Sequence, residues 1–158
     1  MSRSGIGYDS HRFAEGRRLV LGGVEIPHER GLSGHSDADV LTHAVIDALL
    51  GAAGLGDIGQ HFPDSDERYR DADSLVLLGA VVTLVIAAGL QVENVDCTVM
   101  LETPRLGPYR EEIRTRLAQT LDLPLTHVNV KATTGEGIGF VGRGEGAAAL
   151  AIASLGER

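Results

Sequence analysis

The sequence contains a single cysteine and a single lysine, and its acidic residues outnumber its basic ones. Because Cys97 has no partner, no intrachain disulfide can form, and we expect a reducing cytoplasm and a buried, inert thiol. The formal net charge of −8 argues against a general nucleic-acid or anionic-membrane surface, which needs clustered Lys and Arg. Any phosphate ligand would therefore have to be met by metal ions, backbone amides and a few chosen side chains.

Several common sequence motifs are also absent. Residues 1–6 lack the apolar run of a signal peptide, and the longest apolar run, residues 75–88, is shorter than the roughly 20 residues of a membrane span. No P-loop is present, no G-x-G-x-x-G opens a helix, and nothing resembles a nucleophile elbow. Nucleoside triphosphate hydrolysis and dinucleotide binding therefore lose support. Because no signal peptide or membrane span is predicted, we expect a cytoplasmic protein.

The order of apolar patterns predicts one α/β domain that covers residues 1–158. We predict a mixed four-stranded sheet with helices on one face, an α+β sandwich that also carries an N-terminal β-hairpin. The predicted strands are 6–13, 95–101, 128–132 and 147–154, the hairpin is 19–26, and the helices are 37–53, 73–88 and 108–121. The helix at 73–88 is apolar nearly all round, which indicates either oligomerisation or close packing within the chain.

The helix at 37–53 is predicted to begin at Ser36, a good N-cap with Asp39 three residues later. Asp39, His43 and Asp47 follow at intervals of four residues and form a polar strip apart from the apolar face. Either aspartate could orient the second ring nitrogen of His43. The alternative is that the strip is only solvated.

Three residues of the N-terminal third could bind a metal ion. Asp9 and His11 lie two residues apart on a strand, so they share one face, and His43 comes from the helix. One carboxylate and two imidazoles leave a fourth position open, which is typical of catalytic zinc sites, and the same set could hold non-haem iron. The D-x-H motif is short and therefore a weak signal. The alternative interpretation is that His43 is a solvated surface residue of the helix.

The glycine-rich segment 133–140 follows a predicted strand. Its threonine hydroxyls and free amides suit diphosphate oxygens, and Glu136 could hold a hard cation that bridges them. The segment could equally be an ordinary connecting loop.

Taken together, segments 7–13, 35–66, 128–134 and 142–146 closely resemble the 2-C-methyl-D-erythritol 2,4-cyclodiphosphate synthases, the cyclases of the non-mevalonate isoprenoid pathway. The resemblance covers essentially the whole chain. It implies a homotrimer with active sites between neighbouring subunits. It also implies that 4-diphosphocytidyl-2-C-methyl-D-erythritol 2-phosphate is converted to the cyclic diphosphate with release of CMP.

Residue roles carried over from that resemblance are expectations for this chain. Asp9, His11 and His43 would hold one Zn²⁺ per subunit, and Glu136 would hold Mg²⁺ or Mn²⁺ bridging the substrate diphosphate. His35 and Thr134 match the positions of transition-state stabilisation. The substrate-binding positions would be Ser36, Asp57, Ile58, Gly59, Phe62, Pro63, Asp64, Ser65, Asp66, Leu101, Glu102, Thr103, Pro104, Arg105, Leu106, Gly107, Thr133, Gly135, Phe140 and Arg143.

Within that set, the resemblance implies that residues 101–107 receive the cytosine largely through backbone groups. It places Phe140, Arg143 and Glu145 near the trimer axis, where an isoprenoid diphosphate could bind. Gly137 stands where relatives often carry lysine, so we expect one phosphate or loop contact fewer. Two other functions stay open from the residues alone: a metal-dependent phosphoesterase, and a trimeric partner-binding protein without catalysis.

Overall fold

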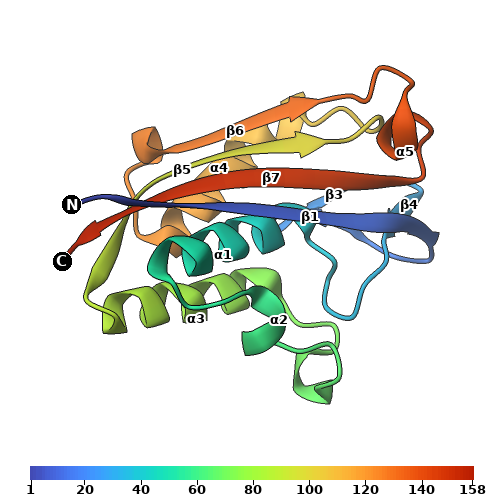
Figure 1. The fold of residues 1–158 in the computed structure, drawn as a ribbon. Helices are drawn as coiled ribbons and strands as arrows, with labels where there is room; N and C mark the ends of the chain where they lie inside the picture. The colour runs from blue at the N-terminus through green and yellow to red at the C-terminus, as the bar shows by residue number, and fades with distance from the viewer.

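A mixed five-stranded sheet forms one layer of the structure, a computed structural model that describes residues 1–158 (Figure 1). Its strands, in spatial order, are β4 (Arg30–Leu32), β1 (Arg3–Glu15), β7 (Gly146–Glu157), β5 (Leu90–Met100) and β6 (Val128–Thr133). Only β5 and β6 run parallel. The long helices are α1 (Val40–Ala53), α3 (Ser74–Ala87) and α4 (Arg110–Leu121). The smaller elements are the hairpin of β2 (Leu19–Leu21) and β3 (Val24–Ile26), the short helices α2 (Ile58–His61) and α5 (Gly139–Gly142), and 3-10 turns at Glu67–Tyr69, Gly107–Tyr109 and Leu125–His127.

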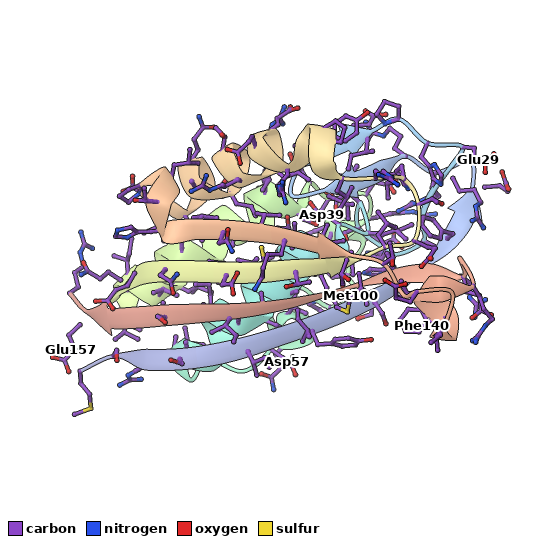
Figure 2. The ribbon with its side chains drawn as sticks, turned by 90° about the horizontal axis from the view of Figure 1, so that it is seen from above. Glu29, Asp39, Asp57, Met100, Phe140 and Glu157 are labelled. Carbon is purple, nitrogen blue, oxygen red and sulfur yellow. The ribbon has the colours of Figure 1, made fainter.

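The helices cover one face of the sheet, as predicted. In Figure 2 the strands lie toward the viewer and α1 and α3 lie behind them, so the near face of the sheet carries no helix. The N- and C-termini lie side by side because β1 and β7 pair antiparallel along nearly their whole length (Figure 1). No helix combines the length and the hydropathy that a bilayer crossing requires.

The prediction of four strands was wrong, because residues 30–32 form a further edge strand instead of a loop. Strand β1 is longer than predicted, and its pairing with β7 ends at Arg12. On the edge that faces away from β7, residues 13–15 offer backbone groups with which β4 pairs antiparallel. Gly31 allows this pairing, since a Cβ there would collide with the carbonyl oxygen of Arg18.

Helix α1 packs unusually close to β1, and this contact positions the candidate site. A Cβ on Gly7 would overlap the backbone of Ala44, and one on Gly5 would overlap the backbone of Ala48. Only glycine on the strand opposite alanine on the helix permits this approach. It brings residue 9 of the strand next to residue 43 of the helix.

The predicted N-cap of α1 was also wrong. The helix begins at Val40 with Asp39 as its N-cap, and Ala38 before it has a left-handed φ of 56°. Asp39 is fully buried: its carboxylate accepts hydrogen bonds from Thr42 N and Oγ1 and from the amides of Gly22 and Gly23 in the β2–β3 turn. Asp39 is thus no part of a solvated strip, and it ties the hairpin to the helix.

Replacing Asp39 with alanine should lower the free energy of unfolding by about 3 kcal/mol, because it removes a helix cap and leaves buried donors without an acceptor. Urea unfolding monitored by circular dichroism measures this change. Asp73→Ala is the matched control, since Asp73 caps α3 at the surface through Leu75 N alone. We expect about 1 kcal/mol for the control. Equal losses would contradict the role given to the buried carboxylate.

Helix α3 follows its prediction within one residue, and packing within the chain covers only one side of it. Leu77, Leu78, Val81 and Val85 are buried, whereas Val76 is 68% exposed.

Cys97 on β5 is buried as predicted, and burial together with the charge of Asp96 raises the pKa of its thiol to about 12. An ordinary thiolate nucleophile is therefore excluded at this position.

Candidate metal and substrate site

Asp9, His11 and His43 converge on one point between β1 and α1. Asp9 Oδ2 lies 2.8 Å from His11 Nε2 and 3.0 Å from His43 Nδ1, and the two ring nitrogens are 3.3 Å apart. All three ligand atoms lie within 4.8 Å of one another. The structure thus brings together the three residues that the sequence pattern indicated.

The protonation pattern of the two rings fits a cation at this point. His11 Nδ1 lies 2.9 Å from the carbonyl oxygen of Ser33, which can only accept, so Nδ1 carries the proton and the Nε2 lone pair faces inward. His43 Nε2 contacts the hydroxyls of Ser36 and Ser74, at 3.1 and 2.8 Å, and its Nδ1 faces Asp9. Facing lone pairs and a carboxylate repel one another unless a proton or a metal ion lies between them. The donor set suits Zn²⁺ or Fe²⁺.

The charges of the site shift its pKa values in opposite directions. Burial opposes ionisation of Asp9, but hydrogen bonds and charge from His11 and His43 outweigh it and lower the Asp9 pKa to about 2. Burial also opposes protonation of His43, yet the hydrogen bond to Asp9 and the charges of Asp39, Asp9 and Asp37 raise the His43 pKa. Asp9 is therefore an anion throughout the physiological range, and His43 retains a proton to higher pH than a free histidine.

We expect the affinity for Zn²⁺ to fall as the pH drops from about 8 to about 6, because the metal must displace a proton held more tightly than usual by His43. In the metal-free protein, the contribution of His43 to the free energy of unfolding changes with pH in the opposite direction. The raised pKa of His43 stabilises the fold fully below its unfolded value near 6.5, and this stabilisation disappears as the pH rises through the folded value. Chelator competition and urea unfolding across this range measure the two effects. A flat affinity profile would contradict the proton competition.

A cavity of about 410 Å³ opens beside the three ligand atoms. Predicted residues that line it are Asp9, His11, His35, Ser36, His43, Ile58, Gly59, Phe62, Pro63 and Asp64. Sequence reasoning missed Gly34, Tyr69 and Leu77, which also line it. Three further residues that were predicted to bind substrate flank the lining in sequence without belonging to it: Asp57, Ser65 and Asp66. Asp66 presents its carbonyl oxygen to His35 Nε2 at 2.9 Å.

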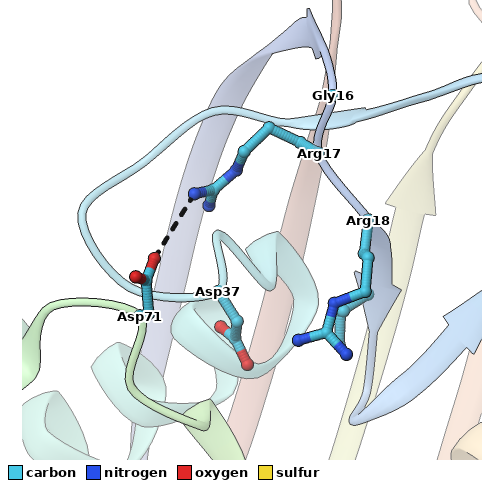
Figure 3. Close-up of a pocket in the computed structure, with 6 residues that line it drawn as sticks. Gly16, Arg17, Arg18, Asp37 and Asp71 are labelled. Carbon is cyan, nitrogen blue, oxygen red and sulfur yellow. Dashed lines mark ion pairs between the residues drawn. The ribbon is translucent and has the colours of Figure 1, made fainter.

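The segment that carries His35 and Ser36 is fixed from outside the cavity by Arg17. The guanidinium donates to the carbonyl oxygens of Leu32 and Ser36, at 3.0 and 2.8 Å, and lies 3.6 Å from Asp71. Figure 3 shows the Arg17 side chain extending toward Asp71 in a separate pocket. The amide of Asp71 donates in turn to the carbonyl oxygen of His35 at 2.8 Å. No local motif signals this clamp, because its parts come from three separate segments.

The segment with Asp57 is held in a similar way. Asp57 caps α2 through a capping box with Gln60, and the amide of Ile58 donates to Asp47 Oδ1 at 2.8 Å. The prediction that Asp39 or Asp47 orients the ring of His43 was therefore wrong. Asp39 caps α1, Asp47 anchors α2, and two serines contact the ring instead.

A second cluster at the ends of β5 and β6, which we call the nucleotide-side cluster, consists of residues 101–107 and 133–136, for which nucleotide binding is only a prediction. Parallel strands end at the same edge of a sheet, so the segments after Met100 and Thr133 emerge together, and Figure 2 shows Met100 at the same end as Phe140. The amide of Leu101 donates to the carbonyl oxygen of Thr133 at 2.9 Å. The amide of Gly135 donates to Glu102 Oε2 at 2.8 Å.

This nucleotide-side cluster does not line the cavity of the metal ligands within one chain. The side chains of Leu101 and Leu106 are buried in the core, which leaves their backbone groups for contacts. Glu136 is exposed, has a φ of 53° and belongs to no group of metal-ligating side chains. Arg143 forms an exposed ion pair with Glu145 at 3.0 Å.

Comparison with known proteins agrees with this geometry. The YgbB family pattern matches residues 2–156. The 2-C-methyl-D-erythritol 2,4-cyclodiphosphate synthase of Salinibacter ruber is 61% identical over 153 residues, which cover 97% of this chain and 98% of that protein.

Solved structures give the same result. A 2C-methyl-D-erythritol-2,4-cyclodiphosphate synthase in a CDP-bound form has a TM-score of 0.90 and 40% identity, over 98% of this chain and 100% of that one. The bifunctional IspDF of Campylobacter jejuni has a TM-score of 0.96 and 44% identity, and all of this chain matches 43% of that longer chain. On these grounds the chain belongs to the YgbB family.

Proposed function

We infer that the chain converts 4-diphosphocytidyl-2-C-methyl-D-erythritol 2-phosphate to 2-C-methyl-D-erythritol 2,4-cyclodiphosphate and CMP. The observation that carries this inference is the Asp9, His11 and His43 cluster, open to a substrate-sized cavity, in a chain 61% identical to a synthase of that name. The reaction is an intramolecular displacement. An oxygen of the 2-phosphate attacks the β-phosphorus, the bond from that phosphorus to the CMP oxygen breaks, and CMP leaves with the electron pair.

The protein needs no nucleophile of its own, because the substrate carries one. The only thiol has a pKa of about 12, and the only lysine, Lys131, lies 2.8 Å from Asp96 in an ion pair. Neither is an activated attacker. The work of the site is to hold a flexible, highly charged substrate in line for attack and to exclude water.

Zn²⁺ is the metal that we propose at Asp9, His11 and His43. When bound, the ion would neutralise phosphate charge as the transition state forms. We propose that Ser36 and His35 contact the same phosphate. The amide of Ala38 donates to Ser36 Oγ at 3.4 Å, and Oγ also faces a protonated ring nitrogen of His43, so its own proton is free for a substrate oxygen.

We propose that the nucleotide-side cluster binds the cytidine diphosphate portion, with Thr134 stabilising the transition state. Glu136 alone offers too few ligands for Mg²⁺ or Mn²⁺, so phosphate oxygens of the substrate would complete the coordination of the ion. Because this cluster does not line the cavity of the metal ligands, a neighbouring subunit is proposed to supply it. The active site would then lie between two copies of the chain.

A homotrimer is the assembly that we propose. The uncovered face of the sheet carries two cross-strand apolar pairs, Ile6 with Ile152 and Tyr8 with Leu150, whose members are 40–68% exposed. Such a patch on a sheet favours burial against another copy. We also propose that an isoprenoid diphosphate binds near Phe140 and Arg143. This binding requires Arg143 to exchange its ion pair with Glu145 for one with phosphate.

Product analysis by ³¹P NMR tests the proposed reaction. Purified protein with Zn²⁺ and Mg²⁺ should convert the diphosphocytidyl substrate to a cyclic diphosphate and CMP. A metal-dependent phosphoesterase would instead give an open bisphosphate, because its metal activates water. Family membership disfavours this alternative. A zinc determination and a native mass measurement test the cofactor and the trimer separately.

A further inference from the structure

The side of His43 that faces away from the metal site makes contacts that the sequence did not predict. Its Nε2 lies 2.8 Å from the hydroxyl of Ser74, a completely buried residue in the first turn of α3. Ser74 lies outside every segment that sequence reasoning assigned to the site. Its hydroxyl nevertheless contacts a metal-ligating ring directly.

Ser74 is in turn held by Asp37. The hydroxyl of Ser74 donates to Asp37 Oδ1, and its backbone amide donates to Asp37 Oδ2 at 2.9 Å. The amide of Asp39 also donates to Asp37 Oδ1, at 3.1 Å. The carboxylate therefore has a fixed orientation with three protein donors.

This arrangement determines which nitrogen of His43 carries the proton. A serine hydroxyl has one proton, and Ser74 gives it to Asp37, so Ser74 Oγ can only accept from the ring. His43 must then donate from Nε2, which leaves the Nδ1 lone pair directed at Asp9 and His11. The opposite tautomer would place a proton where Asp9, His11 and His43 would coordinate a metal ion.

The carboxylate of Asp37 forms no ion pair. It lines the charged pocket of Figure 3 together with Arg17, Arg18 and Asp71, but there Arg17 pairs with Asp71, and no arginine forms an ion pair with Asp37. Helix capping does not account for Ser74 either, because Asp73 already caps α3 through Leu75 N. The lone pairs of Ser74 Oγ are thus free to accept a hydrogen bond from His43.

We propose that Asp37 and Ser74 are positioning residues for the metal site, acting through a hydrogen-bonded chain from the Asp37 carboxylate to the Ser74 hydroxyl to His43 Nε2. The chain fixes the tautomer and the ring orientation of His43 and strengthens it as a ligand. The proposal rests on the metal site of the proposed function. Its test uses metal binding without substrate, so that either can fail while the other stands.

The experiment compares Ser74→Ala with Asp73→Ala, which removes the neighbouring cap of α3 without touching His43. Zn²⁺ affinity is measured by chelator competition, the coordination geometry by the visible spectrum of the Co²⁺-loaded protein, and folding by thermal unfolding without metal. Ser74→Ala should weaken Zn²⁺ binding roughly 10- to 100-fold and change the Co²⁺ spectrum. Asp73→Ala should lower the unfolding temperature and leave both metal readouts unchanged.

A second variant keeps the proposal testable if Ser74→Ala does not fold. Asp37→Asn retains the size of a half-buried side chain but removes the charge that orients the Ser74 hydroxyl. It should weaken Zn²⁺ binding in the same direction and change the Co²⁺ spectrum. Wild-type affinity together with a wild-type Co²⁺ spectrum in folded Ser74→Ala, or in Asp37→Asn, would overturn the proposal.

Discussion

Replacing His43 with alanine should abolish stoichiometric Zn²⁺ binding and reduce CMP formation by at least about a thousandfold. Asp9 and His11 alone supply two ligand atoms, which is too few to hold the ion at a catalytic site. A bound metal contributes several kcal/mol of charge stabilisation in phosphate chemistry, and about 4 kcal/mol corresponds to a factor of roughly a thousand. Zinc analysis and a coupled CMP assay measure both losses on the same preparation.

His127→Ala is the matched control for this substitution. His127 is exposed, and its ring forms a hydrogen bond with the carbonyl oxygen of Glu93, away from the site. We expect this variant to retain both zinc and activity. If His43→Ala kept wild-type activity, the metal cluster would not take part in the reaction. If the unmodified protein itself formed no CMP, a partner-binding protein without catalysis would become the better interpretation.

Mixing two inactive variants should restore activity if each site uses two chains. His43→Ala destroys the metal-side half of a site, and Glu136→Ala destroys the proposed nucleotide-side half. In a mixed ring, a His43→Ala chain next to a Glu136→Ala chain contributes one intact half of each kind. Random assembly of equal amounts should recover about a quarter of the wild-type sites, as expected for a heterologous ring interface.

Mixing His43→Ala with Asp9→Ala is the control, because both changes affect the same half and no intact site can form. Native mass measurement must first show that mixed oligomers are present in each sample. Mixed oligomers of His43→Ala and Glu136→Ala without recovered activity would contradict the shared site. Full activity of Glu136→Ala by itself would remove Glu136 from the mechanism.

The strand pattern predicted part of the metal site correctly for a simple reason. Side chains two residues apart share one face of a strand, so Asp9 and His11 had to lie together. Their approach to His43 depends on a tertiary contact between Gly7 and Ala44 that no spacing within the chain reveals. The residue types suggested His43 as the third ligand but left a solvated His43 open; the resemblance to a family favoured the ligand, and the packing explains its position.

The errors in the sequence analysis share one cause, which is that distant segments decide what a side chain contacts. Asp39 looked like a surface residue of α1, but the β2–β3 turn covers it and uses its carboxylate. Ser74 looked like an ordinary residue at a helix start, but α3 brings it to His43, which lies 31 positions earlier. Strand β4 forms because residues 30–32 meet the edge of β1 that faces away from β7.

The most direct test of the central claim is a reaction with the diphosphocytidyl substrate in water enriched in ¹⁸O, followed by mass spectrometry of the products. Attack by the substrate's own 2-phosphate predicts a cyclic diphosphate and CMP, neither of which carries ¹⁸O from the solvent. Attack by water activated in the metal site would instead give an open bisphosphate, with ¹⁸O in one of the two products. That result would contradict the assignment of the chain as a cyclase.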